Sequence, residues 1–159
     1  MFDFAARLRL LSRRNRTSEV AEAPEGKNTL RLLLVTRDDD LCCSVQNAAA
    51  RCGWQMRLVR SVEQNMPVLD EFRAPLVIYD WNPAEGDWRF AVDCLTARPD
   101  HPCVLLASPV VDQYLWAELV RHGGFEIIPR SANMDELIRI VRFARRSSDV
   151  MGGGRSFSR

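Results

Sequence analysis

Apolar residues fall along the chain in short runs whose spacing predicts five strands. Three runs are continuous, at 30–36, 75–79 and 102–107, and are typical of strands buried on both faces. Apolar and polar residues alternate over 55–59, which predicts a half-exposed edge strand, and 125–128 predicts a short last strand. None of these runs approaches the length of a membrane span, so no such span is expected.

The segments between the strands predict helices. Acids at Asp38 to Asp40 suit the start of the first helix, Gly53 suits a left-handed C-cap at its end, and Pro67 weakens the second. The last helix is amphipathic. The five predicted helices cover 41–52, 62–72, 87–97, 112–121 and 134–145.

Strict alternation of buried strands and helices predicts a parallel α/β sheet with right-handed crossovers and helices on both faces. In such sheets a ligand binds beyond the carboxyl ends of the strands. Polar residues lie at those ends and define the expected pocket. They are Thr36, Arg37 and Asp38 after the first strand, Asp80 and Asn82 after the third, Ser108 after the fourth and Arg130 after the fifth.

The two ends of the chain differ in composition from this core. Residues 17–28 are polar, contain Pro and Gly, and predict a linker. Residues 1–16 are basic with scattered apolar positions, and either a frayed helix or a weak membrane or partner anchor fits them. We expect 1–28 to be flexible, 29–146 to form the domain, and 147–159 to be a disordered tail.

Charge follows the same division. The net charge of +1 combines +2 on residues 1–28 and +5 on 139–159 with −6 on 29–138, so an acidic core carries basic ends. The arginine-rich ends could contact nucleic acid or anionic lipid, but solvated ends are the simpler interpretation and no nucleic-acid partner is expected. Five cysteines without a C-x-x-C pair favour reduced thiols and a cytoplasmic location.

Four anchors in this order resemble the receiver domain of bacterial two-component response regulators. They are LLLVTRDDD, VIYDWNP, VLLASP and GGFEIIPRS, and the resemblance covers about 30–144. It implies a flavodoxin-like (βα)5 fold, a doubly wound parallel sheet of order 2-1-3-4-5 in three α/β/α layers.

The resemblance also implies roles for the pocket residues. Active receivers accept a phosphoryl group on an aspartate, hold Mg²⁺ with two acids after the first strand, and use a hydroxyl and a lysine to bind the phosphoryl oxygens. Asp80 matches the phosphoacceptor, Ser108 the hydroxyl and Arg130 the lysine. The acid positions are Thr36 and Arg37.

Other departures weaken the phosphorylation chemistry further. Pro109 removes a backbone N–H that the family uses for the phosphoryl group. Ser131 replaces a proline that follows a cis peptide, so a trans Arg130–Ser131 bond is expected, and Ile127 replaces the aromatic switch. No metal is expected, and if one binds, Asp38 and Asp80 are its candidate ligands.

The identity of the cation that balances Asp80 is the main open question of the pocket. One hypothesis is that Arg37 substitutes for the metal, pairs with Asp80 and locks one conformation. The alternative is that Arg37 points to solvent and Asp80 is hydrated.

The function predicted from these residues is that of a stand-alone degenerate receiver. It would act as a protein-interaction module in signal transduction, without enzymatic activity or a cofactor. The rival prediction is a working receiver, phosphorylated on Asp80 by a histidine kinase with Mg²⁺. Expected partners are a signalling protein, such as a histidine kinase or output protein, and a second copy bound through the face formed by 112–121, 125–128 and 134–145.

Overall fold

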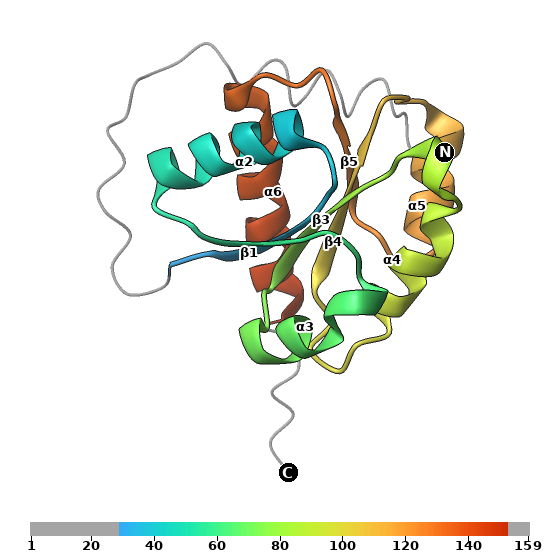
Figure 1. The fold of residues 1–159 in the computed structure, drawn as a ribbon, viewed down its shortest axis with the longest axis horizontal. Helices are drawn as coiled ribbons and strands as arrows, with labels where there is room; N and C mark the ends of the chain where they lie inside the picture. The colour runs from blue at the N-terminus through green and yellow to red at the C-terminus, as the bar shows by residue number, and fades with distance from the viewer. Residues whose placement is uncertain (1–28, 153–159) are drawn as a thin grey trace.

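The computed structural model describes residues 29–152, which form a five-stranded parallel sheet of order β2-β1-β3-β4-β5 (Figure 1). The flavodoxin-like prediction is confirmed, including the strand order. The strands are β1 (Arg31–Val35), β2 (Gln55–Val59), β3 (Leu76–Asp80), β4 (Cys103–Ser108) and β5 (Glu126–Pro129). The helices are α2 (Asp39–Cys52), α3 (Met66–Phe72), α4 (Trp88–Thr96), α5 (Gln113–Arg121) and α6 (Met134–Gly152), with short 3-10 turns η2 (Glu63–Asn65) and η3 (Pro83–Glu85).

Two apolar layers cover the two faces of the sheet. On one face α2 and α6 pack side by side, and Val45 and Val141 are fully buried between them and the strands. On the other face α3, α4 and α5 bury Leu69, Val92 and Leu119. Alternate residues of β1 enter opposite layers, as expected for a strand that is buried on both faces. Leu32 and Leu34 pack in the layer that contains α2 and α6.

The predicted helix signals act where the sequence places them. Asp38 is the N-cap of α2, and Gly53 ends that helix at φ 71°, a conformation that glycine adopts without strain. Pro67 lies in the first turn of α3 and does not interrupt it, although it confines α3 to 66–72 and leaves 63–65 as a 3-10 turn.

The last helix is longer than predicted. Helix α6 runs to Gly152, so the prediction of a disordered tail from residue 147 is wrong for 147–152. Within this extension the Ser148 hydroxyl donates to the Ala144 carbonyl (3.0 Å). The predictions for 1–28 and 153–159 concern segments outside the described residues.

Within 29–152 no helix combines the length and apolar character needed to cross a bilayer. The parallel strands bring the ends of β1, β3, β4 and β5 to one edge of the sheet, which is where the predicted pocket residues lie.

Candidate functional site

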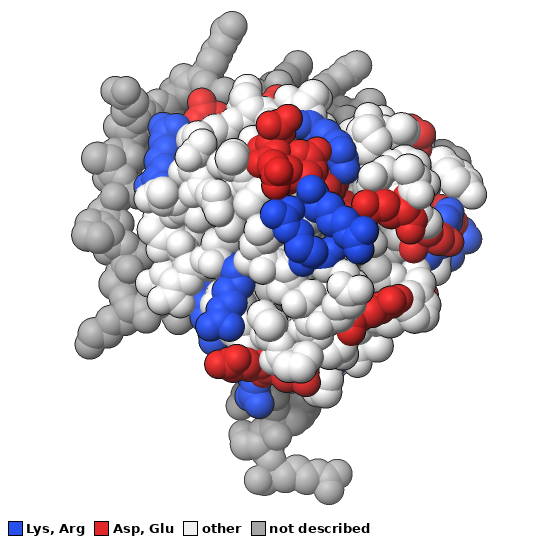
Figure 2. All heavy atoms as spheres, in the orientation of Figure 1, with Lys and Arg blue, Asp and Glu red and all other residues white. Residues whose placement is uncertain are grey.

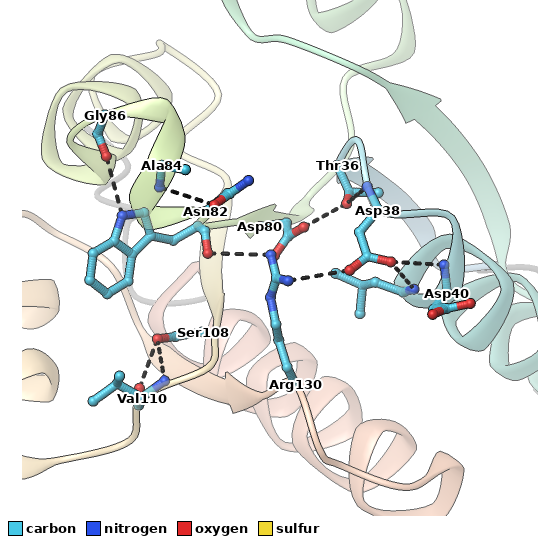
Figure 3. A network of polar contacts seen from close by, with 12 residues as sticks. Thr36, Asp38, Asp40, Asp80, Asn82, Ala84, Gly86, Ser108, Val110 and Arg130 are labelled. Atoms are coloured by element: carbon cyan, nitrogen blue, oxygen red, sulfur yellow. Dashed lines mark hydrogen bonds and ion pairs between the residues drawn. The ribbon is translucent and has the colours of Figure 1, made fainter.

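A polar network links the ends of β1, β3 and β5 through Asp80 (Figure 3). Asp80 is the last residue of β3, and its side chain is only 4% exposed. Burial of a carboxylate is costly unless hydrogen bonds or an opposite charge compensate for the lost water. The partners of Asp80 therefore determine the chemistry of the site.

Arg130 supplies the compensating charge. Its Nη2 donates to Asp80 Oδ1 at 2.6 Å, and its Nη1 donates to Asp38 Oδ2 at 3.2 Å. Nη2 also approaches the Trp81 carbonyl at 3.4 Å. One planar guanidinium thus connects the loop after β5 with the start of α2 and the end of β3, a geometry that a lysine ammonium does not reproduce.

Thr36 completes the shell of Asp80 from the side of β1. Its buried hydroxyl donates to Asp80 Oδ2 at 2.7 Å and accepts from the Asp38 N–H at 2.9 Å. Both carboxylate oxygens of Asp80 are therefore hydrogen-bonded, one to a cation and one to a neutral hydroxyl.

Asp38 has two functions at the site. Its Oδ1 accepts from the N–H groups of Asp40 (2.8 Å) and Leu41 (3.2 Å), which caps α2, while Oδ2 accepts from Arg130. The side chain is thus engaged by the helix and by the guanidinium at once.

Of the two alternatives for Arg37, the structure contradicts the pairing with Asp80 and agrees with a side chain that points to solvent. The Arg37 side chain is 56% exposed, and its Nη1 lies 3.8 Å from Glu85 Oε1. Its Nε donates to the Arg60 carbonyl at 3.4 Å. Both residues follow the end of β1, and the chain bends at Arg37, so that Thr36 bonds Asp80 whereas Arg37 extends outward. A guanidinium does balance Asp80, but it belongs to Arg130.

Ser108 and Asn82 lie at the same edge but bond locally. The buried Ser108 hydroxyl donates to the Val110 carbonyl (2.7 Å) and accepts from the Val110 N–H (3.1 Å), across Pro109. Asn82 Oδ1 accepts from the Ala84 N–H (3.0 Å) and caps η3. The hydroxyl expected to face a phosphoryl group is therefore used in a turn.

Two smaller expectations concern β5 and the loop after it. The Arg130–Ser131 bond is trans, as predicted, because the described part of the chain has no cis peptide bond. Ile127 is 3% exposed and packs in the layer that contains α3, α4 and α5. It fills a core position where an aromatic switch would need space to rotate.

The residues at this edge do not fit the magnesium that active receivers hold. Mg²⁺ requires an octahedron of oxygen ligands, usually with more than one free carboxylate. Asp38 and Asp80 are both bound to Arg130, and no cluster of three or more His, Cys, Asp or Glu suited to a metal occurs within 29–152. A divalent ion between these two carboxylates would also meet the positive charge of Arg130.

Arg60, which follows β2, was not among the predicted pocket residues. Its Nη1 donates to the Thr36 carbonyl (3.3 Å), and its Nη2 donates to Asp39 Oδ1 (3.3 Å). The other pocket residues were predicted because they lie just after a strand, and Arg60 lies just after a strand as well. On the face drawn in Figure 2, arginine side chains lie next to carboxylate side chains.

Comparisons with known proteins support the fold and do not identify a family by sequence. No protein-family model matches the chain. No curated protein matches it either.

Solved structures of response regulators match it closely in shape. The chemotaxis response regulator CheY4 of Vibrio cholerae is 12% identical with a TM-score of 0.67, over 74% of this chain and 99% of that one. A response regulator signal receiver domain from Bermanella marisrubri is 17% identical with a TM-score of 0.64, over 74% and 99%. NtrX from Brucella abortus is 17% identical with a TM-score of 0.71, over 79% of this chain but only 29% of its own length. Residues 29–152 therefore have the fold of response regulator receiver domains.

Proposed function

We propose that this chain is a degenerate receiver that acts in signal transduction as a protein-interaction module. In this proposal the domain works without Mg²⁺-dependent phosphorylation of Asp80 and without catalysis. The receiver fold supports a signalling role, and the site supports loss of the phosphorylation chemistry.

The observation that carries the proposal is the bridge from Arg130 to Asp80 and Asp38. A phosphoacceptor needs one carboxylate oxygen free to attack and a cation that neutralises the phosphoryl oxygens. Here Oδ1 of Asp80 accepts from Arg130 and Oδ2 accepts from Thr36. Attack by Asp80 would use an oxygen that already accepts a hydrogen bond, in a buried site and without the help of a metal.

A phosphodonor experiment tests this proposal. The full chain is treated with acetyl phosphate and Mg²⁺ and examined by intact mass, and in parallel with beryllofluoride and Mg²⁺ by NMR. The Asp80→Asn variant is the control for site-specific modification. We expect no phosphoryl adduct and no beryllofluoride-dependent shifts around Asp80. A stoichiometric adduct that Asp80→Asn abolishes would establish the phosphoacceptor function instead.

The proposed partner is a signalling protein, such as a histidine kinase or an output protein, bound without prior phosphorylation. We also propose that a second copy can pack on the face formed by α5, β5 and α6. Sedimentation of the full chain tests this dimer. The proposal requires that a dimer forms as the protein concentration rises, in the absence of any phosphodonor.

A further inference from the structure

A cleft of about 380 Å³ lies beside Asp80, on the side of the sheet that α3 and α4 cover. The ends of β1 and β3, with Tyr79 and Asp80, form its floor. The loop 60–63 after β2 forms one wall, and α4 forms the other. Its volume is in the range of ligand-binding clefts.

The cleft has an acidic lining. Glu63, Glu85 and Asp87 contribute three negative charges and Arg37 and Arg60 two positive ones, giving a formal charge of −1, since Arg130 balances the fourth acid of the lining, Asp80. Burial raises the pKa of the Tyr79 phenol, and the nearby Glu85, Asp80 and Glu63 carboxylates raise it further. The cleft is therefore an environment that favours a cation.

Exposed apolar surface lies in the same cleft. Phe90, on the wall formed by α4, is 62% exposed, and Cys94 is exposed one turn further along the same side of the helix. A phenyl face next to carboxylates binds guanidinium and ammonium groups, through cation–π contact and charge together. An arginine-bearing peptide with apolar side chains matches this lining.

We propose that the cleft binds the arginine-rich segment 1–16 of this chain. That segment contains five arginines and one aspartate, so it carries a formal charge of +4, and five Phe or Leu residues lie among the arginines. It complements the cleft both in charge and in apolar character. The proposal does not require Asp80 to be phosphorylated.

The chain between segment and cleft is long enough. The cleft lies at the carboxyl end of β1, and residue 29 lies at the opposite end of that strand, about 17 Å away for five residues. Residues 17–28 can span up to about 40 Å when extended, and about 20 Å as a flexible coil. Tethering over this distance gives an effective concentration in the millimolar range, so even a weak contact would be occupied.

Residues 153–159 are a poorer occupant. They contain two arginines and follow α6, which runs back toward the amino-terminal ends of the strands (Figure 1), whereas the cleft lies at the carboxyl ends. Seven residues span at most about 25 Å.

Thiol labelling of the full chain provides the test, because Cys94 lines the cleft and Cys43 is exposed on α2 outside it. Labelling rates at each cysteine are measured by peptide mass mapping in the native chain and in a variant with Arg7, Arg9, Arg13, Arg14 and Arg16 changed to Ser. We expect Cys94 to react about tenfold more slowly in the native chain, given a millimolar effective concentration, and Cys43 to react equally in both. Equal Cys94 rates in the two chains would overturn the proposal.

A matched pair of cleft variants tests the same contact from the other side. Phe90→Ala should weaken the protection of Cys94, whereas Tyr114→Ala, which removes another exposed aromatic outside the cleft, should leave it unchanged. Equal protection in both variants would contradict the role of Phe90 and the cleft as the docking surface.

A disulfide trap shows whether the contact is within one chain. In the Leu10→Cys variant, oxidation at low protein concentration should link position 10 to Cys94 within a monomer and far less to Cys43. A link formed only between two chains would contradict the intramolecular contact proposed here, and so would equal yields at Cys94 and Cys43.

Discussion

Among the arginines that follow strands at the carboxyl end of the sheet, Arg130 after β5 engages the buried acid and Arg37 after β1 does not. Arg130 donates to both Asp80 and Asp38, whereas Arg37 extends outward to Glu85. Their charge is the same, and their distance along the chain from a strand end is similar. The two arginines differ in the direction of their side chains and in the burial of their acidic partners. The side chain of Asp80 is 4% exposed, whereas that of Glu85 is 45% exposed. Removal of one partner from a buried ion pair leaves an uncompensated charge and costs more free energy than removal of one partner from an exposed pair.

The largest expected effect comes from removing the buried cation. Arg130→Met should lower the free energy of unfolding by about 3 kcal/mol, because it leaves Asp80 buried without a counter-charge. Arg37→Met, the matched control, should change it by no more than about 0.5 kcal/mol, as expected for an exposed pair. Urea unfolding measures both, and equal losses would refute the distinction between the two arginines.

A smaller loss is expected from the neutral partner of Asp80. Thr36→Val keeps the shape but removes a hydroxyl that bonds both Asp80 and the Asp38 N–H, and should cost about 2 kcal/mol. Ser108→Ala is the control, since that hydroxyl bonds only within its own turn, and should cost about 1 kcal/mol. Thermal and urea unfolding of both proteins measure the difference, and a larger loss for Ser108→Ala would contradict the network.

The smallest effect concerns the dual function of Asp38. Asp38→Ala removes a helix cap and one acceptor of Arg130, and should cost about 1.5 kcal/mol. Asp112→Ala removes a comparable cap on α5, without a link to the site, and should cost about 1 kcal/mol. A double-mutant cycle with Arg130→Met isolates the part of the Asp38 effect that depends on the guanidinium. A coupling near zero would show that Asp38 acts as a cap alone.

Much of the fold could be predicted from the sequence, because its signals are local. Continuous apolar runs place the strands, and Asp38 and Gly53 mark the ends of α2. The carboxyl end of α6 could not be predicted in the same way. Ser147, Ser148 and the glycines that follow resemble a tail, whereas a hydrogen bond from Ser148 to Ala144 lies within the helix.

The sequence predicted which residues lie in the site more accurately than which of them bond to one another. Position after a strand selected Thr36, Asp80 and Arg130, which the fold brings together. Of the two alternatives for Arg37, the pairing with Asp80 was wrong, because the chain bends at residue 37 after β1 and the side chain extends to Glu85, which position after a strand does not reveal. The turn that uses Ser108 depends on a backbone carbonyl two residues away, which composition does not reveal.

The central claim is that the guanidinium of Arg130, and not a divalent ion, balances the charge of Asp80. Titration of the unmodified full chain with Mg²⁺, followed through the backbone amide NMR signals of Asp38, Asp80 and Trp81, tests it most directly. If Arg130 holds Asp80 as described, these signals show no saturable shift at millimolar Mg²⁺. A saturable shift at all three residues that Asp80→Asn abolishes would contradict this claim.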